Sequence, residues 1–222
     1  MPTDARTIAI GDIHGCHDQL LVLLAKIKAH AGNRPSLGVF LGDYVDRGPK
    51  SRNVVNQVIG LCSSKRGESA VKWHAIKGNH EEMMVANLAL PDITDHWICN
   101  GGGTTVASYA KHEEQMQAHG KWMAKLPSHF ETEHYYFVHA GISPRYKLGE
   151  QPEEVKLWIR NWQGDDPDMG KHIVYGHSPE KKPRLMAHST GLDTGAFYWG
   201  TLTCGVFDET KAAGPVDILE AK

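Results

Sequence analysis

Short apolar runs that lead straight into polar side chains constrain this chain more than any other feature of its sequence. Five such runs occur, within the segments IAIGDIHG, VFLGDYVDRG, HAIKGNHEE, YFVHAG and IVYGHS. Their polar residues are Asp12, His14, Asp43, Asp46, Arg47, Asn79, His80, Glu81, His139 and His177. In an open α/β sheet, ligands bind outside the carboxyl ends of the strands, where loops bring side chains together. The pattern therefore predicts a single site built from five strand ends.

The rest of the chain has the pattern of an α/β fold. Apolar, β-branched runs alternate with stretches of helical periodicity. We expect strands at Thr7–Ile10, Leu37–Leu41, Ala70–Ile76, Tyr135–Val138, Ile173–Tyr175, Leu202–Phe207 and Val216–Leu219. We expect helices at about Cys16–Ala29, Ser51–Leu61 and Glu81–Ala89, with one or two more between Thr105 and Leu126.

Length and composition favour one globular domain that spans residues 1–222. The chain is 41% hydrophobic and 23% charged, and a chain of this size can bury a core of its own. A net charge of −2 and a pI of about 6.7 give no basic surface for phosphate backbones. We therefore expect no nucleic-acid partner.

Cysteine usage and the lack of a long apolar run predict a soluble, cytoplasmic protein. The four cysteines form no C-x-x-C motif, and the first residues lack the apolar stretch of a signal peptide. The longest apolar run, Leu20–Ala25, has six residues, whereas a membrane helix needs about 20. We expect no membrane partner, and the sequence leaves the oligomeric state open.

The residue types at the five strand ends favour a metal site. Carboxylates gathered at one point repel one another unless a cation neutralises them, and a mixture of carboxylate and imidazole suits Zn, Fe and Mn better than Ca or Mg. The candidate ligands are Asp12, His14, Asp43, Asn79, His139 and His177. Six ligands exceed what one ion takes from a protein, whereas two ions about 3.5 to 4 Å apart, sharing a carboxylate, would use all of them.

Each motif taken alone has a simpler explanation. Asp12 and His14 could cap the following helix, and His139 or His177 could be a hydrogen-bonded histidine of the core. Five such motifs in one chain, all with residue types that bind metals, favour the shared site over five separate explanations.

In chain order, GDIHG, GDYVDRG, GNHE, HAG and GHS resemble the phosphoprotein phosphatase family of calcineurin-like metallophosphoesterases, over residues 7 to 207. The segments GNHEEMM, HWICNGGGTT and DTGAFYWGTLT look like its compact bacterial and phage branch, typified by the lambda phage phosphatase. The resemblance implies an α/β sandwich of two mixed β-sheets flanked by helices.

The resemblance also implies roles for individual residues. One ion would be held by Asp12 and His14, the other by Asn79, His139 and His177, with Asp43 between them. Arg47 and Arg160 would grip the substrate phosphate, for which a planar guanidinium is suited. For Arg160 a structural role, stacked between Trp158 and Trp162, remains the alternative.

Charge considerations give the expected mechanism. Two cations would lower the pKa of a shared water, so that hydroxide attacks phosphorus in line. His80 is placed to protonate the leaving oxygen, and Asp46 would orient its imidazole and raise its pKa.

We therefore expect a phosphatase with two Mn²⁺ ions, or with Fe or Zn instead, that acts on phosphoserine, phosphothreonine or phosphotyrosine of proteins or peptides. The alternative is a symmetrical diadenosine tetraphosphate hydrolase, which the chain resembles through GLDTG and GTLTC. Against it, those hydrolases replace the Asp of D-R-G, where this chain has Asp46. They also carry a long insertion where this chain has only 38 residues from His139 to His177. A phosphate-sensing protein without catalysis is disfavoured, because every expected ligand and acid residue is present.

Overall fold

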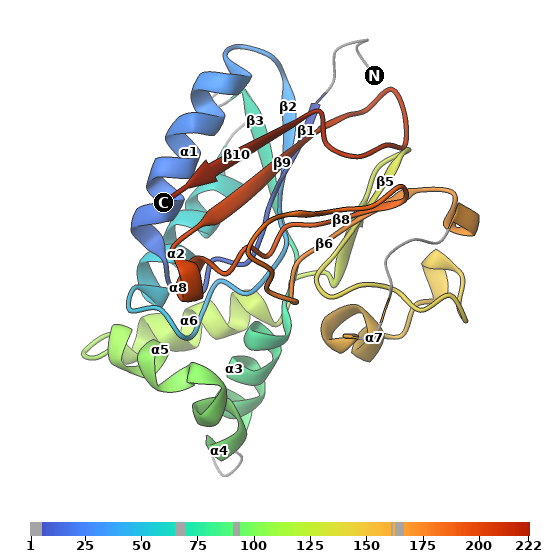
Figure 1. Cartoon of the computed structure of the whole chain (residues 1–222). Helices are drawn as coiled ribbons and strands as arrows, with labels where there is room; N and C mark the ends of the chain where they lie inside the picture. The colour runs from blue at the N-terminus through green and yellow to red at the C-terminus, as the bar shows by residue number, and fades with distance from the viewer. Residues whose placement is uncertain (1–5, 65–69, 91–93, 161, 163–166) are drawn as a thin grey trace.

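Two mixed five-stranded sheets pack face to face and are flanked by helices (Figure 1). This computed structural model describes residues 6–64, 70–90, 94–160, 162 and 167–222. The architecture is the α/β sandwich that the sequence analysis expected.

The first sheet has the strand order β10-β9-β1-β2-β3. Its strands are β1 (Arg6–Ile10), β2 (Ser36–Phe40), β3 (Val71–Ala75), β9 (Leu202–Asp208) and β10 (Asp217–Ala221). The first three run parallel, β9 is antiparallel to β1, and β10 is antiparallel to β9. Because β1, β2 and β3 end at the same edge, the loops that follow them emerge side by side.

The second sheet has the order β4-β5-β6-β8-β7. Its strands are β4 (His129–Glu131), β5 (Tyr135–Val138), β6 (His172–Tyr175), β7 (Arg184–Leu185) and β8 (Ser189–Gly191). β5, β6 and β8 are parallel, and the two edge strands are antiparallel to their neighbours. The ends of β5 and β6 therefore also lie next to each other.

Apolar side chains from both sheets form the core between them. Val39 and Leu41 from the first sheet pack with Phe137 and Val174 from the second, and Phe207 meets Phe137 edge to face at 6.3 Å. All five side chains are fully buried. Alternate residues of each strand point inward, which is the pattern that brings two sheets together.

Helices α1 (His17–Ala31) and α2 (Ser51–Cys62) cover the other face of the first sheet (Figure 1). Leu20, Leu23 and Ile27 are buried, and their spacing of three and four residues places them on one side of α1. The helix predicted at about Cys16–Ala29 is thereby confirmed.

Shorter helices gather at one end of the molecule, at the bottom of Figure 1. They are α3 (Asn79–Ala89), α4 (Thr94–Trp97), the π-helical turn η2 (Ile98–Gly102), α5 (Gly103–Ser108) and α6 (Glu113–Met123). α3 packs against both α4 and α6. Beside the second sheet lie η3 (Leu148–Glu150), α7 (Glu153–Trp158) and η4 (Pro167–Met169), and α8 (Ala196–Trp199) precedes β9.

The predicted elements exist, with ends that differ by one or two residues in most cases. Helix α3 begins at Asn79 instead of Glu81, because the Glu81 carboxylate turns back to accept a hydrogen bond from the Gly78 amide at 2.9 Å. The sequence analysis missed β4, β7, β8, α4, α7 and α8. These have two to six residues, too few to show a hydrophobic period.

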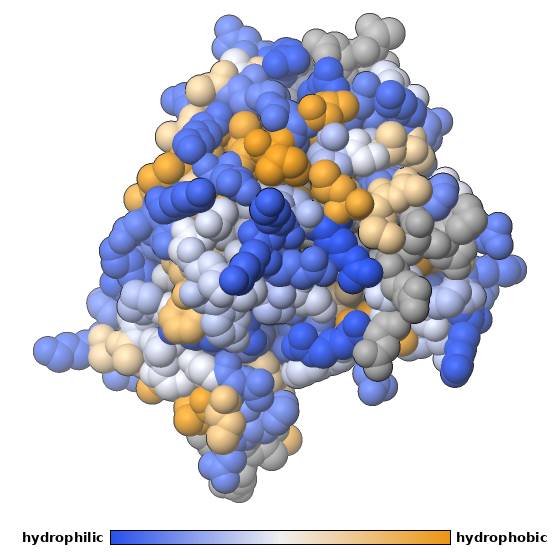
Figure 2. All heavy atoms as spheres, in the orientation of Figure 1, coloured by the Kyte–Doolittle hydropathy of each residue, from blue (hydrophilic) through white to orange (hydrophobic). Residues whose placement is uncertain are grey.

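None of the described helices is long and apolar enough to cross a membrane. The face drawn in Figure 2 is largely hydrophilic, with hydrophobic side chains gathered over β9 and β10. Val216, just before β10, is 51% exposed.

Candidate metal centre

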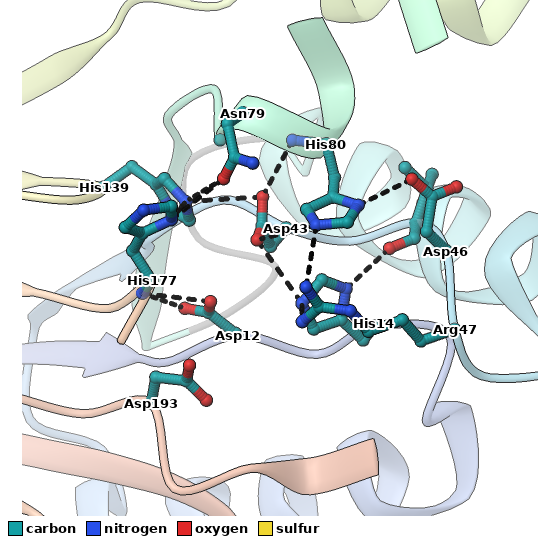
Figure 3. Close-up of polar contacts among 12 residues, drawn as sticks. Asp12, His14, Asp43, Asp46, Arg47, Asn79, His80, His139, His177 and Asp193 are labelled. Carbon is teal, nitrogen blue, oxygen red and sulfur yellow. Dashed lines mark hydrogen bonds and ion pairs between the residues drawn. The ribbon is translucent and has the colours of Figure 1, made fainter. Parts of the chain in front are cut away.

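The structure brings the five strand-end motifs together at one place. Asp12 and His14 follow β1, Asp43 follows β2 and Asn79 follows β3, while His139 and His177 follow β5 and β6 of the other sheet. All six side chains are buried, none being more than 4% exposed. The single site expected from the sequence is therefore present in the fold (Figure 3).

Asp43 lies between two groups of possible ligands (Figure 3). Its Oδ2 is 3.4 Å from Nε2 of His14 and 3.9 Å from Nε2 of His80, and its Oδ1 is 3.4 Å from Nε2 of His139. The groups His14, Asp43, His80 and Asp43, His139, His177 each have ligand atoms within 4.8 Å of one another. Two ions that share Asp43 would fit this arrangement.

Backbone carbonyls orient two of the imidazoles. Nδ1 of His14 lies 2.8 Å from the carbonyl oxygen of Val45, and Nδ1 of His139 lies 2.8 Å from that of Leu41. A carbonyl oxygen can only accept, so each Nδ1 carries the proton. Nε2 of each neutral ring then presents a lone pair toward Asp43, as in a histidine that binds a metal.

Burial keeps these imidazoles neutral. It lowers the pKa of His14 to about 3 and that of His177 to about 2, and it lowers the pKa of His139 as well. A metal ligand must be the neutral form, so the environment suits this role.

Electron-rich atoms face one another on the His139 side. Nε2 of His139 lies 2.8 Å from Oδ1 of Asn79 and 3.2 Å from Nδ1 of His177. With its proton on Nδ1, His139 has no hydrogen to give to the Asn79 oxygen. Nδ1 of His177 also lies 3.0 Å from the same Asn79 oxygen. A cation among these atoms would satisfy them, so the residues present fit a metal ion.

Asp12 lies beside this group and is fixed by the chain. The backbone N–H of His177 donates to both carboxylate oxygens of Asp12, at 3.1 and 3.0 Å. Burial, together with Asp193 and Asp43, raises the pKa of Asp12 well above its ordinary value. Crowded carboxylates of this kind favour a bound cation. Which ion Asp12 would bind stays a prediction.

The backbone of the site is strained. Among the described residues other than glycine, six have a positive φ, and five of these belong to the site: His14, Asp43, Asp46, Arg47 and His177, with φ from 45° to 72°. Such conformations cost free energy and cluster at functional sites. Two glycines leave room for the carboxylates of the site because they have no Cβ. A Cβ on Gly78 would lie 2.2 Å from Oδ1 of Asp43, and one on Gly176 would lie 2.0 Å from Oδ1 of Asp12.

Asp46 and His80 form a buried pair. Nδ1 of His80 lies 2.7 Å from Oδ2 of Asp46, and the carboxylate also accepts hydrogen bonds from Nε1 of Trp97 at 2.9 Å and from the hydroxyl of Thr105 at 2.7 Å. Burial lowers the pKa of His80, but Asp43 and Asp46 raise it overall. The pair can therefore hold a proton next to the candidate metal centre.

Trp97, Thr105 and Glu81 support the site through hydrogen bonds. The sequence analysis did not single out Trp97 or Thr105, and it gave Glu81 no role of its own. The Glu81 carboxylate accepts hydrogen bonds from the backbone N–H groups of Asp43 and Tyr44, both at 2.8 Å, and so fixes the loop that carries Asp43. Trp97 and Thr105 lie in the HWICNGGGTT segment, whose unusual composition was the available signal.

The two arginines differ in how closely they join the site. Arg47 donates from one guanidinium nitrogen to Nε2 of His14 at 2.6 Å, and its second nitrogen lies 3.1 Å from Nε2 of His80. Its backbone N–H donates to the carbonyl of Gly101 at 3.2 Å, which ties it to the glycine-rich loop. Arg160 is exposed, and its charge contributes to lowering the pKa of His139 and of His177. Arg47 is thus in direct contact with the site, and a role of Arg160 in binding an anion stays a prediction.

Comparison with known proteins identifies similar chains. Residues 5–201 match the family model described as calcineurin-like phosphoesterase. A bis(5'-nucleosyl)-tetraphosphatase (asymmetrical) of Oceanobacillus iheyensis is 28% identical over 91% of this chain and 88% of its own length. The protein of the same name from Bacillus cereus is 30% identical over 87% of each chain.

Solved structures share the fold at lower identity. The crystal structure of a candidate diadenosine tetraphosphatase superposes with a TM-score of 0.68 at 21% identity, covering 100% of this chain and 95% of that one. A cold-active protein-tyrosine phosphatase of Shewanella gives a TM-score of 0.67 at 16% identity, covering 100% of this chain and 83% of that one.

Proposed function

The chain belongs to the calcineurin-like phosphoesterase family, and on this basis we propose that it hydrolyses dinucleoside tetraphosphates asymmetrically, into a nucleoside triphosphate and a nucleoside monophosphate. The observation that carries the proposal is the similarity to asymmetrical tetraphosphatases over about nine tenths of the chain.

From the sequence we expected a protein phosphatase, with tetraphosphate hydrolysis as the alternative. The curated relatives favour the alternative, in its asymmetrical form. The two arguments against it, the presence of Asp46 and the short segment from His139 to His177, were made for symmetrical hydrolases.

The residues of the site suit a polyphosphate substrate. Metal ions bound around Asp43 would supply neutralisation of phosphate charge and a water of lowered pKa. We propose that both ions are Mn²⁺. Asp12 would join His14 and Asp43 in holding one ion, and Asn79 would join Asp43, His139 and His177 in holding the other. Arg47 and Arg160 add two guanidinium groups that would bind and orient the anion.

His80 would protonate the oxygen that leaves phosphorus, and Asp46 would keep its imidazole oriented. The 2.7 Å contact between Nδ1 of His80 and Asp46 leaves Nε2 facing the centre, where it lies 3.9 Å from Asp43. A leaving phosphate is a weak base and needs little help from an acid, whereas an alkoxide needs much. The contribution of His80 should therefore depend on the substrate.

The pair of His80 and Asp46 supports a second candidate function, the hydrolysis of phosphorylated side chains. A general acid held by a buried carboxylate has most to offer when the leaving group is a serine or threonine alkoxide. The likeness to the protein-tyrosine phosphatase structure, at 16% identity, concerns the fold alone.

The comparison that separates the two functions is kcat/KM for diadenosine tetraphosphate and for phosphoserine, phosphothreonine and phosphotyrosine peptides under one metal condition. We expect the dinucleotide value to exceed every peptide value. A phosphopeptide with a higher kcat/KM would make the second candidate the better description.

A further inference from the structure

An exposed aromatic segment lies at the edge of the candidate metal centre. The one-turn helix α8 carries Phe197, Tyr198 and Trp199, which are 44%, 51% and 46% exposed. The ring of Tyr198 lies 5.5 Å from that of Phe197 and 5.9 Å from that of Trp199. Three consecutive aromatic side chains in solvent leave a large apolar surface uncovered. The mechanism described above uses none of them.

Tyr198 is connected directly to the site. Cζ of Arg47 lies 5.3 Å from the centre of the Tyr198 ring, and the same guanidinium donates to Nε2 of His14. In Figure 1, α8 lies beside the loop that follows β2, the loop that carries Arg47. The aromatic surface and the metal centre are therefore continuous through one side chain.

The backbone that carries these rings is well fixed. α8 lies between Gly195 and Gly200, which have φ of 65° and 76°. The N–H of Gly195 donates to Asp193 at 3.0 Å, and the hydroxyl of Thr194 donates to the carbonyl of Thr201 at 2.8 Å. The Trp199 ring covers Gly195 so closely that a Cβ there would lie 2.3 Å from Cε3. The exposed faces are thus presented in a set position.

We propose that Tyr198 and Phe197 form a platform for one nucleobase of the dinucleoside tetraphosphate. The base stacks on the face of Tyr198 and borders Phe197, whose ring is inclined at 65° to that of Tyr198, and Arg47 holds the phosphate attached to that nucleoside. The inference rests on the function proposed above and adds the residues that read the nucleoside. Every nucleobase has a flat π face, and aromatic side chains bind such faces with little regard to base identity. The face of Tyr198 can therefore accept either base of a mixed dinucleotide.

The position of the platform accounts for unequal products. A nucleoside carries its base and its first phosphate on one ribose. A base on Tyr198 therefore brings the first phosphate next to Arg47 and the metal centre. Cleavage near the first phosphate releases a monophosphate, whereas cleavage into equal halves requires the base to lie two phosphates from the centre.

The test compares a nucleotide with a base-free polyphosphate. Titration calorimetry with the Mn²⁺-loaded protein gives Kd for ATP and for inorganic tripolyphosphate, so the readout needs no turnover. The variants are Tyr198→Ala, Tyr198→Leu, Tyr198→Phe and Phe197→Ala. Leu185→Ala is the control, because it removes an apolar side chain that is 56% exposed on β7, at the edge of the second sheet.

Removal of a stacked ring weakens base binding by about 5- to 150-fold. We expect Tyr198→Ala to raise Kd for ATP by about tenfold more than Kd for tripolyphosphate, and Phe197→Ala to act in the same direction. Tyr198→Phe should restore ATP binding and Tyr198→Leu should not, because stacking needs a ring. Leu185→Ala should leave both constants unchanged.

Equal changes for the two ligands, or Tyr198→Phe binding ATP as poorly as Tyr198→Ala, would overturn the platform. Failure of the proposed function looks different. The aromatic variants could lose affinity for ATP selectively while the wild-type protein leaves diadenosine tetraphosphate intact. That result would support the platform and contradict the tetraphosphatase function.

Discussion

Replacing Thr105 by valine removes one hydrogen bond to the buried carboxylate of Asp46 with little change of shape. The Thr105 hydroxyl donates to Oδ1 of Asp46 at 2.7 Å, and it also accepts from the Asp46 N–H at 2.8 Å. Both residues are fully buried, so water cannot replace the lost partner. The Asp46 N–H keeps a second acceptor, the hydroxyl of Ser51 at 3.1 Å, so the main loss is the bond to the carboxylate. A hydrogen bond to a charged group contributes about 1.5 to 3 kcal/mol, and we expect the free energy of unfolding to fall by about that amount.

Urea unfolding measures this loss, and two comparisons show where it comes from. Thr104→Val is the matched control, because the neighbouring hydroxyl donates at 2.9 Å to the neutral, half-buried carbonyl of Gly101 and should contribute only about 0.5 to 1.5 kcal/mol. In an Asp46→Asn background the effect of Thr105→Val should shrink by about 1 kcal/mol or more, since the charge is gone. A loss no larger than that of Thr104→Val, or one that persists undiminished in the Asp46→Asn background, would refute the reasoning.

Three further predictions concern the centre itself. Protein treated with a chelator should lose hydrolytic activity and regain more of it with Mn²⁺ than with Mg²⁺ or Ca²⁺. Asp43→Asn should reduce the metal content of both ion positions, and full occupancy in that variant would exclude a shared ligand. His80→Asn should keep the metal but lose about 10²- to 10⁴-fold in turnover of phenyl phosphate, with a smaller loss for nitrophenyl phosphate, and equal losses would exclude an acid. Gly78→Ala, whose Cβ would meet Asp43 at 2.2 Å, should weaken Mn²⁺ binding by about tenfold or more, unlike Gly60→Ala on open α2 surface; equal affinities would contradict this close approach.

The positions of the candidate ligands could be predicted because they depend on local patterns. Each follows an apolar strand, and parallel strands place their carboxyl ends at one edge, so strand order along the chain was enough to group Asp12, Asp43 and Asn79. His139 and His177 joined them because the second sheet packs with its β5 and β6 ends at the same place.

The supporting contacts could not be predicted, because they join residues far apart in the chain. Trp97 and Thr105 reach Asp46 across more than 50 residues, and Tyr198 reaches Arg47 across about three times that separation. No periodicity or spacing marks such pairs. The substrate class could not be predicted from the motifs either, because hydrolysis of phosphate esters and of phosphate anhydrides can use the same metal ligands.

The products formed from diadenosine tetraphosphate test the proposed function most directly. Mn²⁺-loaded protein is incubated with this substrate, and the nucleotides are separated by ion-exchange chromatography at early times, before secondary hydrolysis. We predict equal amounts of ATP and AMP, lost in Asp43→Asn. Two molecules of ADP per substrate, or an intact dinucleotide under conditions in which phosphopeptides are cleaved, would contradict it.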